Sequence, residues 1–390
     1  MISRIAFWLL AAFVFTIPFE KSIALPGVGT LTKILGGAAL VAGISSAAAH
    51  RNLRFPNLAI LMAAVFIVWN WATWLWSLDR AATLVRAITL TQLGLLLWLV
   101  WQICRTARQQ RLLLAAYAAG ATVASIATIV RYGQHLQTYW NRYAAPGFDP
   151  NDLGITVSIA IPVALYLASR STSGVASIFR IAVVLYCTAI LLTGSRTALI
   201  ASLAAFTLVA WTWRNSSTGQ RISGLALTLL LISGAVLLAP KESRSRISTI
   251  GRELTQGTLH NRTTIWKAGV KVLRRYKLVG AGAGAYPAAV KPLIGVPGRP
   301  GHEYVAHNTF LSVLVETGLI GFALFIAFLA VIATFIWVMP NPERAFWTVA
   351  LAVWVIGAST LTWEHRKPGW LLFALVTTEW ARAFRPENQS

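Results

Sequence analysis

Charge is scarce in this sequence, and acidic charge is scarcest. Of its 390 residues 12% are charged, and 12 residues are Asp or Glu. A soluble domain has about a quarter of its residues charged, so a chain built from soluble domains is excluded. The 56% hydrophobic composition and the mean hydropathy of +0.63 indicate one helical bundle in a membrane.

Cysteine is also scarce. Cys104 and Cys187 are the two cysteines, and both lie inside apolar runs. A disulfide framework and a cysteine-based metal site are therefore not expected. We expect no metal and no other cofactor.

Long apolar runs, by contrast, recur along almost the whole chain. They predict an all-α polytopic membrane protein of about twelve transmembrane helices with one large, mostly helical periplasmic loop. The predicted spans centre on residues 5–19, 33–49, 57–77, 83–104, 111–131, 152–169, 179–193, 197–213, 222–239, 318–338, 345–361 and 369–384. The first run resembles a signal peptide, but no small-x-small cleavage site follows it, so we interpret it as a span.

The distribution of Lys and Arg predicts that both termini are cytoplasmic. Thirteen then lie in cytoplasmic segments and about eight in short outer loops, as the positive-inside rule requires. Residues 240–305, between the transmembrane regions 1–239 and 306–390, differ because they carry a net charge of +9. Outer segments of this length are largely exempt from the rule. The basic loop indicates either an anionic ligand, such as a diphosphate, or contact with lipid headgroups.

The run HNTFLSVLVETGLIG, residues 307–321, places a histidine where the basic loop meets the membrane. If the run is one helix, His307, Gly318 and Gly321 share a face, and the glycines let a neighbouring helix approach. A neutral imidazole can accept a proton from a hydroxyl or hydrogen-bond a phosphate. The alternative is a histidine beside an Asn308 helix cap, with packing glycines only. On the same helix Glu316 falls opposite His307, and we expect it to be buried against a neighbour.

Two further segments supply cations. Arg196, in LLTGSRTALIA, interrupts an apolar stretch at the outer ends of two spans, where a diphosphate or simple snorkelling would account for it. From Arg262 an amphipathic helix is predicted, with Trp266 beside Arg262 and Lys267 on the adjoining basic face. The glycines at 280, 282 and 284 do not have the spacing of a nucleotide-binding loop.

A fourth segment, RYAAPGFDPNDLG at residues 142–154, precedes the sixth span. Asp149, Pro150 and Asn151 indicate a turn followed by a helix cap. Asp149 and Asp152 could together bind a divalent cation, but two acids without further clustering favour the cap.

These four segments, in this order, resemble the O-antigen ligase and polymerase superfamily, and the ligase of lipopolysaccharide assembly in particular. The resemblance covers about residues 142–321 and rests on His307, Asn308, Gly318 and Gly321, the SRTALIA run at Arg196, the Arg262/Trp266 stretch and the Pro150–Asn151 turn. Asp149 departs from the family pattern, so we assign it no role.

The resemblance implies an inverting, metal-independent glycosyl transfer at the periplasmic face of the bacterial inner membrane. The donor would be a glycan on undecaprenyl diphosphate and the acceptor a sugar hydroxyl of lipid A–core. His307 would assist the hydroxyl or steady the phosphate, and Arg196 and Arg262 would hold the diphosphate. We assign substrate contacts to Arg142, Asn151, Trp266, Lys267, Tyr286 and Asn308, and we expect membrane lipids but no nucleic acid as further partners.

Other functions remain open at this stage. A polymerase of the same superfamily would use lipid-linked glycan as both donor and acceptor, and a protein O-oligosaccharyltransferase would use a serine or threonine. A transporter or flippase for lipid-linked sugars would also suit about twelve spans. Transporters, however, usually carry charged or broken helices near the midplane, whereas the charges of interest here collect on the outer side.

Overall fold

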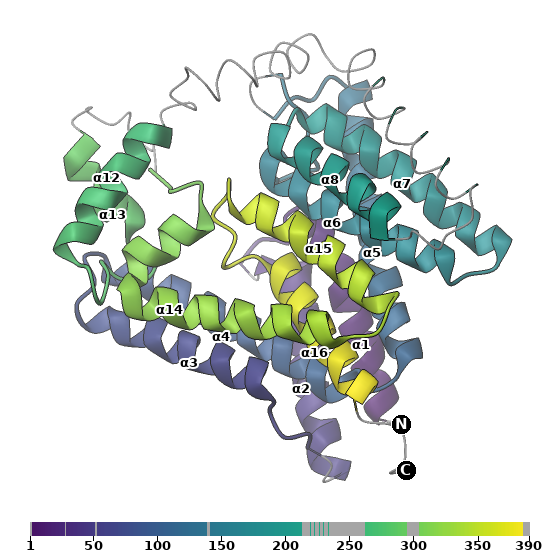
Figure 1. Cartoon of the computed structure of the whole chain (residues 1–390), viewed down its shortest axis with the longest axis horizontal. Coiled ribbons are helices and arrows are strands. Elements are labelled where there is room, and N and C mark those ends of the chain that lie inside the picture. Colours follow the sequence, from purple (N-terminus) through teal and green to yellow (C-terminus); the bar gives the residue numbers. More distant parts are fainter. Residues whose placement is uncertain are drawn as a thin grey trace.

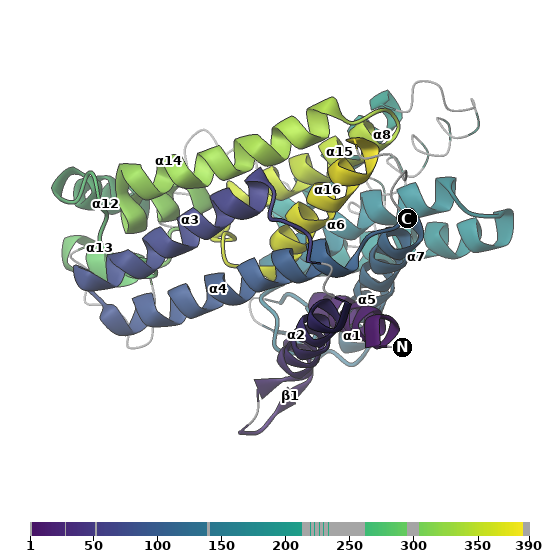
Figure 2. The same cartoon turned by 90° about the horizontal axis from the view of Figure 1, so that it is seen from below.

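A computed structural model describes residues 2–27, 29–50, 53–138, 141–212, 262–294 and 304–384, with isolated positions between 219 and 233. The described chain is helical apart from one two-residue antiparallel pairing (Figures 1 and 2). In order, the elements are α1 (Ile2–Thr16), η1 (Ile17–Phe19), β1 (Ala24–Leu25), β2 (Gly29–Thr30), α2 (Leu31–His50), α3 (Leu58–Ala72), η2 (Thr73–Leu75), α4 (Arg80–Ile103), α5 (Ala107–Gly133), α6 (Pro150–Ser169), α7 (Ser173–Thr193), α8 (Arg196–Thr212), α12 (Arg262–Arg275), α13 (Tyr286–Ile294), α14 (Thr309–Val338), α15 (Glu343–Ala358) and α16 (Lys367–Phe384).

The helices follow the predicted spans. Within the described ranges, eight segments are long and apolar enough to cross a membrane: α1 with η1, α2, α3 with η2, α4, α5, α6, α7 and α14. α8, α15 and α16 occupy three more predicted spans but are shorter or more polar. The predicted span 222–239 lies almost entirely outside the described residues, so the total of twelve stays a prediction. The all-α membrane class is confirmed.

α6 lies at the centre of one half of the bundle. Its apolar stretch is 89% buried, and it packs against α5, α7, α8 and α15. In the other half α3 and α4 run alongside α14 (Figures 1 and 2). α12 and α13 lie beside the start of α14 and share with it a small core of their own, which includes Val272, Tyr286 and Val315.

The loops predicted to lie outside the membrane gather at one end of the bundle. The loop after α1 reaches the loop before α6, since the Ser22 hydroxyl donates to Pro146 O at 3.0 Å, and it reaches α16 through the Glu20–Lys367 ion pair. The loop before α15's partner α16 reaches α8, where Thr360 donates to the Thr197 hydroxyl at 2.8 Å. The start of α1 and the end of α16 lie on one side of the molecule (Figure 1). Which side of the membrane this is stays a prediction.

The helix predicted from Arg262 is confirmed as α12, but the predicted buried face is shifted. Val270, expected on that face, is 43% exposed, whereas Ala268, Gly269 and Val272 are buried. The small residues decide the face because Tyr286 packs onto them: a Cβ at Gly269 would lie 2.4 Å from its hydroxyl oxygen. The first part of the predicted loop subdomain, up to residue 261, lies outside the described residues.

The single helix predicted for residues 307–321 is wrong. α14 begins at Thr309, and Gly318 breaks it with φ 69° and ψ −173°. A glycine adopts this conformation without the steric cost that a Cβ would bring. His307 and Gly318 therefore do not share the face of one regular helix.

The break is bridged by the glycine-rich loop after α12. The amides of Ala281 and Gly282 donate to Val315 O and Glu316 O at 2.9 and 2.8 Å. Trp69 of α3 donates its indole N–H to Thr317 O at 2.9 Å. On the other side of the break the amides of residues 319 and 320 donate to the carbonyls of residues 277 and 278. Gly280, Gly282 and Gly284 all have positive φ values and serve this close approach.

We predict that Gly318→Ala destabilises the protein. The alanine Cβ would lie 2.2 Å from Leu278 O, and the backbone conformation alone costs a non-glycine residue about 1–3 kcal/mol. The unfolding midpoint of the detergent-purified protein should fall clearly. Gly174→Ala is the matched control, because a Cβ there meets nothing within 4 Å, and it should leave the midpoint in place. Equal midpoints for the two variants would contradict the role of the break.

Candidate functional site

His307 lies just before α14, at the end of the bundle where the loops gather. Its φ is 46°, a left-handed conformation that is uncommon for a residue other than glycine. Asn308 caps the helix, since its side-chain oxygen accepts the amide of Leu311 at 3.0 Å. Trp266 of α12 donates its indole N–H to Ala306 O at 2.7 Å. The imidazole is thus fixed by the segments on both sides of it.

The charges around His307 come from two of the other predicted segments. Burial and the nearby Arg262 lower the pKa of His307 to about 4, against a smaller opposing effect of Asp152. The imidazole is therefore neutral at ordinary pH and can accept a proton or a hydrogen bond. The structure brings together the histidine motif, the start of α12 and the start of α6.

Asp152 is a junction of the loops. Its carboxylate accepts the indole N–H of Trp363 at 3.0 Å, and it pairs with Arg366 at 2.8 Å and with Lys21 at 3.7 Å. The neighbouring Asp149 caps α6 by accepting the amides of residues 151 and 152, and burial raises its pKa. Both carboxylates thus have partners within the protein, as the cap interpretation requires. Among the described residues no group of three acids, histidines or cysteines is placed to hold a metal ion.

Arg142 and Asn151 brace the loop before α6. Arg142 is 4% exposed, and it donates to Thr193 O at 2.6 Å and to the Asn151 side-chain oxygen at 2.8 Å. A guanidinium so buried holds the end of α7 against the start of α6. We therefore reassign both residues from substrate contact to support.

Arg196 is the first residue of α8, directly after the turn that ends α7. Gly194 supplies the left-handed residue of that turn. The start of α8 packs closely on α6, since a Cβ at Gly154 would lie 2.7 Å from the Ala198 Cβ. Thr197, next to Arg196, contacts Thr360 in the loop that also carries the Asp152 partners. Arg196 thus lies on a fixed helix end.

The remaining predicted contacts divide into supporting and exposed residues. Tyr286 is 1% exposed and donates its hydroxyl to Ile265 O at 3.0 Å, so it supports α12 and does not face a substrate. Lys267 is exposed on α12 and remains available to an anion. Gly318 and Gly321 allow close approach as predicted: a Cβ at Gly321 would lie 2.7 Å from Trp69 of α3.

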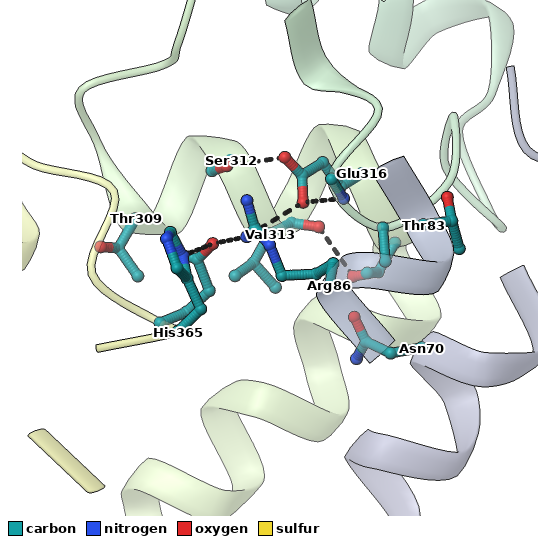
Figure 3. Close-up of polar contacts among 12 residues, drawn as sticks. Asn70, Thr83, Arg86, Thr309, Ser312, Val313, Glu316 and His365 are labelled. Carbon is teal, nitrogen blue, oxygen red and sulfur yellow. Dashed lines mark hydrogen bonds and ion pairs between the residues drawn. The ribbon is translucent and has the colours of Figure 1, made fainter. Parts of the chain in front are cut away.

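A buried charge cluster was not predicted. Arg86 of α4 pairs with Glu364 and, at 3.5 Å, with Glu316, and His365 contacts Glu364 at 3.1 Å (Figure 3). Glu316 also accepts the Ser312 hydroxyl at 3.1 Å and the Gly284 amide at 2.7 Å. Its predicted burial is confirmed, since it is 3% exposed. The signal in the sequence was an arginine inside the predicted span 83–104 and the charged run from Glu364 to Lys367.

This cluster is electrostatically balanced. Burial raises the pKa of Glu364, but Arg86 and His365 lower it by more, so the carboxylate is ionised. Burial, reinforced by Arg86, lowers the pKa of His365 to about 4 and keeps that imidazole neutral. Thr309 connects the cluster to the loop that carries Trp363: its hydroxyl donates to Leu361 O and accepts the Trp363 amide, each at 2.8 Å.

Residues 181–326, from α7 to α14, match the family model described as O-antigen ligase. This part of the chain belongs to the O-antigen ligase superfamily. The matched region contains Arg196, Arg262, His307, Gly318 and Gly321, whereas Arg142 and Asn151 precede it. Comparison with curated proteins found no match. Members of the O-antigen ligase superfamily are glycosyltransferase-type enzymes, and the apolar helices fit a multi-pass protein of the bacterial inner membrane.

We predict that Arg86→Leu is strongly destabilising. It would leave Glu316 and Glu364 buried together without their cation, and breaking a buried pair costs about 3–5 kcal/mol. Unfolding titrations in detergent would measure the loss, with Arg274→Leu on exposed α12 as the control, expected within about 0.5 kcal/mol of wild type. Adding Glu364→Gln to Arg86→Leu should recover part of the loss. No recovery would show that the loss does not come from the carboxylates.

Proposed function

We propose that the protein is an O-antigen ligase. It transfers O-antigen polysaccharide from undecaprenyl diphosphate to a sugar hydroxyl of lipid A–core, on the periplasmic side of the inner membrane, with both termini in the cytoplasm. The observation that supports this most directly is a neutral His307 held beside Arg262 within the matched family region.

The transfer is a single displacement. The acceptor hydroxyl attacks the anomeric carbon of the donor sugar, and a new glycosidic C–O bond forms as the bond from that carbon to the diphosphate oxygen breaks. The bonding electrons leave with the diphosphate, and attack from the opposite face inverts the anomeric configuration. His307 takes the hydroxyl proton, for which its neutral imidazole is in the required state.

The cations stabilise the leaving group. Arg196 and Arg262 begin α8 and α12, and Lys267 is exposed one turn further along α12. Guanidinium groups bind phosphate oxygens through two parallel hydrogen bonds, which become stronger as negative charge develops on the leaving oxygen. Because diphosphate is already a good leaving group, positioning and cationic stabilisation suffice without a metal.

A reconstituted assay tests this function. Purified protein, undecaprenyl-diphosphate glycan, lipid A–core and a chelator should give glycan-bearing lipid A–core, seen as a ladder on a gel. His307→Ala and Arg196→Ala should abolish the ladder, whereas Lys291→Ala, which removes an exposed cation of α13, should retain it. Lengthened lipid-linked glycan in place of the ladder would identify a polymerase, and neither product from folded protein would favour transport.

The pH dependence tests the role of His307. Because its pKa is lowered to about 4 from the usual 6.5, the neutral base persists as the pH falls through 6.5. The transfer rate at limiting donor should therefore hold down to about pH 5 and decline only as the pH approaches 4. A decline centred near pH 6.5 would contradict this environment. Near-normal turnover of His307→Gln would exclude proton abstraction by this residue.

A further inference from the structure

A lateral groove lies between α1, α2 and α4, away from the residues assigned to the transfer reaction. Its cavity volume is about 260 Å³. The walls are apolar and include Phe13 of α1, Leu40 of α2 and Leu93, Leu96 and Leu99 of α4. Only 17% of the apolar stretch of α2 is buried, so this helix has neighbours on one side and is open to the bilayer on the other.

Two glycines make the space. A Cβ at Gly36 would lie 3.1 Å from the Phe13 ring, so Gly36 brings α2 close to α1. Gly37 lines the groove, and a Cβ there would meet nothing within 4 Å. The groove therefore exists because position 37 carries no side chain. A large residue would fill it without a clash against the backbone.

The groove is polar at one end only. Lys33, His365 and Lys367 line it where the loops gather, and the leucines line the part further along α2 and α4. Lys367 pairs with Glu20, and His365 with Glu364, so two of these groups have acidic neighbours. Lys33 is exposed, and within the described part of the chain no carboxylate lies within salt-bridge distance of its ammonium. An anion at this end and hydrocarbon beyond it would match both parts of the lining.

The polar end is adjacent to the candidate site. His365 lies close to Thr309 (Figure 3), and Thr309 is two residues after His307. A lipid with its phosphate at this end would lie near the histidine and extend its chain along α2 and α4.

We propose that this groove binds the polyprenyl chain of the lipid-linked donor, with Lys33 and Lys367 contacting its phosphates. This rests on the proposed function, because the groove would otherwise have no phosphate-bearing polyprenyl ligand to take. A narrow groove between three helices takes one chain, which suits a polyprenyl lipid and not the several acyl chains of a lipid A. Charge complementarity at the loop end selects the phosphorylated form.

Binding of undecaprenyl diphosphate without glycan tests the inference independently of transfer. Gly37→Trp fills the groove and should weaken binding about tenfold or more, the equivalent of about 1.4 kcal/mol. The matched Gly174→Trp, on α7 and also in open space, should bind as wild type does. Lys33→Gln should weaken binding of undecaprenyl diphosphate but not of undecaprenol, whereas Gly37→Trp should weaken both. Unchanged binding by folded Gly37→Trp would overturn the inference.

A labelling experiment on the wild-type protein covers the case in which the variants fold poorly. An undecaprenyl diphosphate analogue with a photoreactive group in its chain should label peptides from α2 and α4. Labelling confined to other helices, or equal displacement by a two-chain phosphatidylglycerol, would overturn the proposal. The two hypotheses fail separately: groove-dependent binding without any transfer would remove the ligase function, and transfer with labelling elsewhere would remove the groove.

Discussion

The structure depends on the need to satisfy backbone hydrogen bonds where α14 is broken. In a bilayer an unsatisfied amide or carbonyl costs several kcal/mol, so a break in a spanning helix requires outside partners. Here residues 277–282 and Trp69 supply them on both sides of Gly318. The loop that follows α12 is therefore fixed to α14. Because α12 is anchored in this way, Trp266 can reach Ala306, and the conformation of His307 follows from a break eleven residues away.

The cations of this chain divide into two groups with different work. Arg86, Arg142 and Arg366 are engaged with carboxylates, carbonyls or an amide oxygen of the protein. Lys33 and Lys267 are exposed on helix surfaces. The net charge of +22 does not by itself distinguish the two groups. The engaged cations fix the loops to one another, and the exposed ones are those that a diphosphate can reach.

The sequence predicted most of the helices because long apolar runs have few alternatives in a membrane. It also predicted the Asn308 and Asp149 caps and the burial of Glu316. The break at Gly318 could not be predicted, because its conformation depends on a loop about forty residues earlier in the chain. For the same reason Arg142 and Tyr286 looked like ligand residues: a cation or a phenol in a polar segment gives no sign of the carbonyl that it will meet. The Arg86 cluster joins residues up to 278 positions apart, which spacing along one helix does not reveal.

The same burial that stabilises the loops sets the chemistry of the candidate site. The loop from Leu361 to Arg366 contacts Thr309 on one side and Asp152 on the other. These contacts enclose His307 beside Arg262 and keep its imidazole neutral. A more open loop would hydrate the imidazole and return its pKa toward the usual value, with more of it protonated and unable to act as a base. Loop packing and base strength are therefore linked, and residues that never touch a substrate, such as Trp363 and Thr309, act on the reaction through the environment of one histidine.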